Sequence, residues 1–85
     1  MNLKELTTGH SESEVLQLVI LIREFAEAQI ELANESLSIR SLEQESILRR
    51  IKDIVSKLRG PPWNISTDVL YLISENPDVW ITECE

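Results

Sequence analysis

The chain has 85 residues, of which 42% are hydrophobic and 27% are charged, and its formal net charge at pH 7 is −7. This length allows one domain, and a chain this short buries only roughly 60 to 65% of its unfolded surface, so we expect modest stability. The composition is typical of a folded protein and argues against disorder over most of the length.

The sequence has no feature that directs it to a membrane or out of the cell. Its first ten residues lack a basic segment followed by an apolar core, so they are unlike a signal peptide. The longest apolar stretch, residues 15–22, is interrupted by Gln17 and is far too short to span a bilayer. The single cysteine, Cys84, fits a reducing compartment. We therefore expect a cytoplasmic protein without membrane contacts, in which Cys84 is an exposed tail thiol.

The cations are concentrated in the middle of the chain, because six of the eight Lys and Arg residues fall within residues 40–59. Residues 1–39 sum to −5, residues 40–59 to +3 and residues 60–85 to −5, and Lys or Arg is absent after Arg59. Such segments attract one another, or present one sign of charge to a partner. We expect Arg49 and Arg50 to pair with acidic residues of the preceding helix.

A long amphipathic helix is predicted from residue 11 onward. Ser11 and Glu14 have the spacing of a capping box, in which a serine and a glutamate satisfy the first free amides of a helix. Apolar residues then recur at steps of three and four, and an acidic face lies opposite. That face contains Glu24, Glu27, Glu31 and Glu35. Leu16, Ile20 and Leu21 widen the apolar stripe, so we expect two sides of this end to be covered.

A second helix is predicted up to residue 59, after a break or bend near residues 36–41. Ser41 and Gln44 repeat the capping spacing, although one uninterrupted helix is the alternative. The apolar stripe of the second helix consists of Ile47, Ile51, Ile54, Val55 and Leu58. Gly60 followed by Pro61 and Pro62 ends the helix, because proline cannot continue the amide ladder.

The last quarter of the chain can be interpreted in two ways. Ser66 and Asp68 favour a short capped helix, whereas β-branched and aromatic residues on both sides of residues 76–78 are also typical of a β-hairpin. We favour the helix. We expect Trp63 and Trp80 to pack in the core or in a satellite cluster next to it, and the sequence leaves the role of Tyr71 open between core and interface.

The predicted fold is therefore all-α, a single domain over residues 1–85 with three or four helices built on a long antiparallel helical hairpin. Residues 1–10 form an N-terminal extension, residues 11–60 the hairpin and residues 61–85 a closing segment. The alternative is an α+β fold with a C-terminal β-hairpin.

No cluster of residues points to a reaction, so we expect no catalysis, no cofactor and no metal. The only histidine, His10, precedes a helix cap, where a solvent-exposed turn residue is the simpler interpretation. The glutamates of the first helix lack the Glu-x-x-His pairing of di-metal bundles. A DNA-binding regulator is an alternative because of the cations in residues 49–59, but the net charge of −7 argues against binding to phosphates.

Two short segments resemble a known family. Met1-Asn2-Leu3-Lys4, then residues 11–19 and Ile22, and later Pro61-Pro62 with Thr67-Asp68-Val69-Leu70-Tyr71, are similar to segments of the colicin and pyocin nuclease immunity proteins. Leu72 stands where that family has a second tyrosine. The resemblance implies a small acidic helical inhibitor in which Asp68 and Tyr71 occupy the positions that contact the nuclease.

The function that we predict is binding to another protein. In this hypothesis Asp68 and Tyr71 supply central contacts to a basic partner, while Glu24, Glu27 and Glu31 steer its approach. The alternative is a homodimeric structural protein, in which the wide apolar stripe of the first helix pairs with a second copy.

Overall fold

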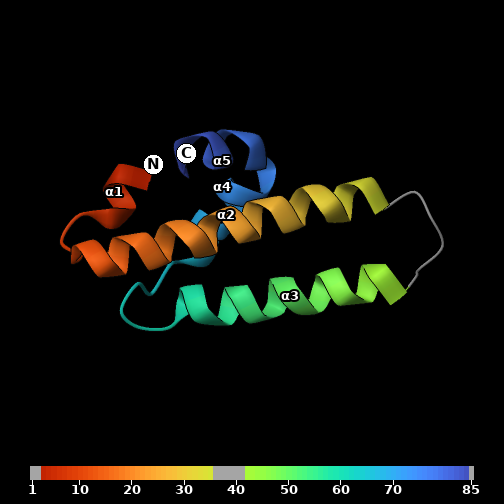
Figure 1. Ribbon diagram of the computed structural model, residues 1–85, viewed down its shortest axis with the longest axis horizontal. Helices are drawn as coiled ribbons and strands as arrows, with labels where there is room; N and C mark the ends of the chain where they lie inside the picture. The colour runs from red at the N-terminus through yellow and green to blue at the C-terminus, as the bar shows by residue number, and fades with distance from the viewer. Residues whose placement is uncertain (1–2, 36–41, 85) are drawn as a thin grey trace.

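The computed structural model describes residues 3–35 and 42–84, and these form helices without any strand (Figure 1). The helices are α1 (Leu3–Thr7), α2 (Glu12–Glu35), α3 (Leu42–Arg59), α4 (Thr67–Glu75) and α5 (Pro77–Cys84). The predicted all-α class is confirmed for this part of the chain, but it contains five helices rather than three or four. The predicted break near residues 36–41 lies outside the described residues.

The start of α2 agrees with the capping box predicted from the sequence. The Glu14 amide donates to Ser11 Oγ at 3.2 Å, and the Ser11 amide donates to Glu14 Oε1 at 3.1 Å. Two free amides at the helix start are thus satisfied reciprocally. Residues 1–10 were expected to be a plain extension, whereas residues 3–7 form the short helix α1. The Leu3 amide of α1 donates a hydrogen bond to Glu83 Oε2 of α5 at 3.1 Å.

Helices α2 and α3 lie side by side and run in opposite directions (Figure 1). Ile54 and Leu58 of α3 are buried in one core with Phe25 of α2. The end of α3 at Arg59 agrees with the prediction from Gly60 and the two prolines. Beyond them the Ile65 amide donates to the Leu58 carbonyl at 2.8 Å, which fixes the path of the chain toward α4.

The last quarter is two helices, so the alternative of a C-terminal β-hairpin is wrong. Ser66 caps α4, because its side chain accepts the Val69 amide at 3.3 Å. Val69, Leu70 and Ile73 are buried at helical spacing, which a strand could not bring to one side. Pro77 opens α5 instead of making a hairpin turn, since a fixed φ and a missing amide suit the first helical position.

Helix α2 is covered from two directions, by α3 and by α5 (Figure 1). Trp80 of α5 is buried in the core, and Trp63 is half-buried and packs against this core. Both placements agree with the prediction. The cover does not reach all of the broad stripe, because Leu16 and Ile20 remain exposed.

Cys84 was expected to be an exposed tail thiol, and this expectation is wrong. Its Sγ lies 3.6 Å from the Val19 carbonyl of α2, and the side chain packs half-buried against the core. Burial raises the pKa of the Cys84 thiol above its usual range. The residue belongs to the contact between α5 and α2.

Candidate protein-binding surface

One side of α4 exposes an apolar pair between two carboxylates. Asp68, Tyr71, Leu72 and Glu75 follow one another at steps of three, one and three residues, so they share the side of α4 opposite its buried residues. We refer to these four residues as the α4 face. Tyr71 is 65% exposed and Leu72 is 41% exposed. A ring and an aliphatic chain are thus presented to solvent with one carboxylate on each side.

The chain segment that contains the α4 face carries charge of one sign. Residues 60–84 contain no lysine or arginine, and their carboxylates Asp68, Glu75 and Asp78 are all exposed, as is Glu83. Val79, directly after Asp78, is a further exposed apolar residue. An apolar centre inside a charged rim is the arrangement that protein interfaces use. The surface is therefore suited to a partner with lysines and arginines around an apolar contact.

A hollow of about 240 Å³ adjoins Tyr71. Ile51 and Val55 of α3 line one side of it, and Leu70 and Ser74 of α4 line another. Phe25 and Gln29 of α2 also line it, so Tyr71 is one edge of a concave, largely apolar feature between three helices. A side chain of a partner that contacts the ring can also enter this hollow, which adds buried area to the contact.

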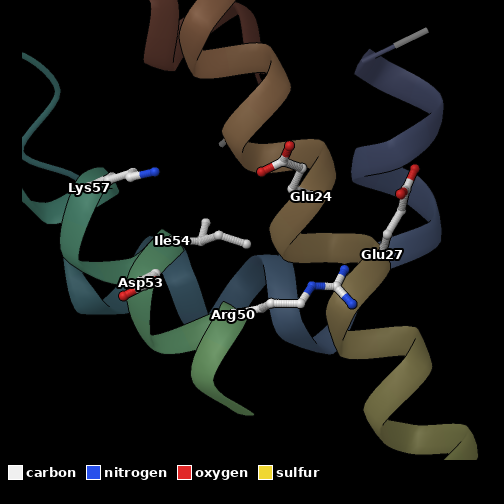
Figure 2. Close-up of a pocket in the computed structure, with 6 residues that line it drawn as sticks. All are labelled: Glu24, Glu27, Arg50, Asp53, Ile54 and Lys57. Carbon is white, nitrogen blue, oxygen red and sulfur yellow. The ribbon is translucent and has the colours of Figure 1, made fainter. Parts of the chain in front are cut away.

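The glutamates predicted to steer a partner lie elsewhere. Glu24 and Glu27 of α2 line a groove of about 430 Å³. Arg50, Asp53 and Lys57 of α3 line it from the other side (Figure 2). This groove shares no lining residue with the hollow beside Tyr71. The structure therefore divides the five predicted residues into two separate groups.

Two of these glutamates are already paired within the chain. Arg23 Nε donates to Glu27 Oε1 at 3.0 Å, and Arg50 Nη1 donates to Glu31 Oε2 at 2.9 Å. The pairing expected for Arg50 is confirmed, whereas Arg49 is exposed and has no ion pair within residues 3–35 and 42–84. The paired side chains are about half exposed, so each pair adds little stability. Their charges nevertheless cancel locally, which weakens the field that Glu27 and Glu31 were expected to supply.

The residues that the sequence interpretation missed are Leu72 and Glu75. The signal was present, because they stand four and seven residues after Asp68 on a helix capped by Ser66. The resemblance drew attention only to Asp68 and Tyr71. Reading α4 as an amphipathic helix would have grouped all four residues on its outer side.

Within the described part of the chain, no group of three His, Cys, Asp or Glu side chains is placed to hold a metal ion. His10 Nδ1 lies 3.8 Å from Glu14 Oε1 and is mostly covered. The Ser11 amide, which donates to the Glu14 carboxylate, holds the pKa of Glu14 below its usual range. This carboxylate therefore serves the helix cap. None of the helices in the described ranges has the length and apolar character needed to cross a membrane.

Comparison of the chain with protein-family models, with curated proteins and with solved structures finds no match. The resemblance to nuclease immunity proteins therefore stays a prediction, as does the DNA-binding alternative.

Proposed function

We propose that this chain is a small protein-binding module of the inhibitor type, which binds a basic protein, such as a nuclease toxin, through the α4 face. One observation carries the proposal: Tyr71 is 65% exposed beside Leu72, in a segment, residues 60–84, whose charged side chains are all carboxylates. The proposal includes a cytoplasmic location, which the single unpaired thiol supports.

In this proposal the ring of Tyr71 and the carboxylates of Asp68 and Glu75 contribute to binding in different ways. A tyrosine buries a large rigid area at low entropic cost and carries a hydroxyl that can bond to the partner. Asp68 and Glu75, about one turn to either side, are placed to accept hydrogen bonds from lysine or arginine. Charges of one sign also speed the encounter with an oppositely charged protein, and this effect weakens as salt is added.

The roles of the five predicted residues follow from their placement. Asp68 and Tyr71 make direct contacts in this proposal. Glu24 adds to the long-range field from the groove on α2, whereas Glu27 and Glu31 contribute less because Arg23 and Arg50 offset their charge.

The test is site-specific photo-crosslinking in the cell that makes the protein. A photoreactive amino acid is placed at Leu72, and in a control at Arg49, which is exposed on a side of α3 away from Ile51 and Val55. We expect a basic protein to be crosslinked from position 72 and not from position 49. The same adduct from both positions, or an acidic protein as the only adduct at position 72, would contradict the proposal.

Purified components then give the energetics. Tyr71→Ala should weaken binding of the identified protein by about tenfold or more, as for a central interface residue. Asp68→Asn should mainly slow association and reduce its dependence on salt. An unchanged affinity for Tyr71→Ala would show that the α4 face is not the contact.

A further inference from the structure

A second exposed apolar surface lies on α2, away from the α4 face. Leu16 is 62% exposed and Ile20 is 56% exposed. Ser13, Leu16, Ile20 and Arg23 follow at steps of three, four and three residues, which places them on one line along the helix. This is the spacing with which one helix packs along another. We refer to these four residues as the α2 patch.

A hollow of about 460 Å³ lies beside the α2 patch. Ile20 and Leu21 of α2 and Trp63 of the α3–α4 loop form its apolar walls, and Glu24 and Lys57 lie at its edge. The indole of Trp63 is held in place, since its Nε1 donates to the Glu14 carbonyl at 3.3 Å. The same surface thus offers projecting apolar side chains and, next to them, a recess with an apolar wall.

A surface that carries both a projection and a recess can pair with itself. A two-fold axis across α2 brings Leu16 of one copy against Ile20 of the other, and this contact forms twice. Two projecting side chains can then enter two recesses at once. A partner of another kind would need to supply both shapes separately.

The charges at the ends of the α2 patch complement each other in an antiparallel pair. Glu12 and Arg23 are both exposed and lie at opposite ends of the Leu16 and Ile20 pair, toward the same edge of the helix. When two copies of α2 run antiparallel, Arg23 of each copy comes opposite Glu12 of the other. Arg23 can keep its hydrogen bond to Glu27 in this arrangement, because a guanidinium has several donors. The α4 face is not self-complementary in this way, since pairing two copies of it would bring carboxylates against carboxylates.

We infer that the α2 patch is a homodimer interface in which two copies of the chain pack with their α2 helices antiparallel. The inference does not depend on the proposed function, because the dimer leaves the α4 face unused. An interface formed by so few exposed side chains associates weakly, so we expect the dimer to form only at high concentrations of the protein.

Sedimentation velocity from roughly 10 µM to 1 mM tests the inference, since weak interfaces dissociate in this range. The wild-type chain should shift from monomer to dimer as its concentration rises. Ile20→Glu should raise the dissociation constant about a hundredfold, because the change occurs twice in a symmetric dimer. Val79→Glu on α5 is the matched control, since Val79 and Ile20 are 57% and 56% exposed, and it should leave the dimer intact.

A charge exchange tests the antiparallel orientation. Glu12→Arg and Arg23→Glu should each weaken the dimer, and the two together should restore much of the affinity. Circular dichroism of each variant checks that it is folded. A wild-type chain that is monomeric at the highest concentration, equal effects of Ile20→Glu and Val79→Glu, or a double variant no better than the single ones would overturn the inference.

Discussion

Replacing Ala26 by leucine tests how closely α5 is packed on α2. The Ala26 side chain has no solvent exposure, and Val19, seven residues earlier on the same side of α2, contacts Cys84 of α5. Ala33, seven residues later on that side, is exposed. Replacing each alanine by leucine changes the helix propensity of α2 by the same small amount, so the two variants differ in packing alone.

The expected loss of stability in Ala26→Leu follows from the lack of free space around the Ala26 side chain. The core that includes this residue also holds Ile73 and Trp80, which are 0% and 4% exposed. An added isopropyl group must displace such neighbours, and overpacking of this kind costs about 1 to 3 kcal/mol. Ala33→Leu should change the free energy of unfolding by less than about 0.5 kcal/mol, as surface substitutions do. The loss at Ala26 is a large share of the total, which for 85 residues is about 4 to 13 kcal/mol.

Urea unfolding followed by circular dichroism measures the difference. At about 1 to 1.5 kcal/mol per molar urea, the midpoint of Ala26→Leu should fall by about 1 M or more, and that of Ala33→Leu should stay within about 0.5 M of wild type. Equal midpoints for the two variants would refute the close packing of α5 on this side of α2.

Two further predictions concern titratable groups. Because burial raises the pKa of Cys84, less thiolate is present at pH 8 in the folded chain. The folded chain should therefore react with a disulfide reagent more slowly than the same chain in urea. Equal rates would contradict the contact of Cys84 with Val19. The pKa of Glu14 is lowered in the folded state, so its stabilising effect is complete above the unfolded pKa of about 4.3 and is lost as the pH falls through the folded value. Wild-type stability should therefore fall relative to that of Glu14→Gln below about pH 4.5, and parallel pH profiles would show that the cap carries no charge effect.

The sequence predicted those parts of the fold that depend on local chemistry. The capping box of Ser11 and Glu14, the stop after Arg59 and the cap at Ser66 each involve residues a few positions apart, so their geometry can be read from spacing alone. The apolar spacing on α2 and α3 likewise predicted the burial of Phe25 and Leu58, although Leu16 and Ile20 of the same broad stripe are exposed.

The sequence could not predict features that depend on contacts between distant segments. Short apolar stretches on both sides of Pro77 are compatible with a strand as well as with the favoured helix, and the packing of α5 on α2 decides between them. The burial of Cys84 depends on the same contact, 65 residues away along the chain. The separation of Tyr71 from Glu24 is also tertiary, since only the packing of α4 places them in different hollows.

The charge pattern of the sequence takes on a different meaning once the helices are placed. The acidic side of α2 was expected to face a partner, but Arg50 of α3 pairs with Glu31 across the two helices, so part of that charge is offset within the molecule. The segment after Arg59 has no lysine or arginine that could offset its carboxylates, and Asp68 and Glu75 of this segment lie on either side of Tyr71 on α4. A surface of one sign repels its own copy and attracts a basic protein, whereas the α2 patch, with Glu12 and Arg23 at its two ends, can meet itself. The two surfaces are therefore suited to different occupants, so the proposed dimer and the proposed complex with a basic protein do not compete for the same surface.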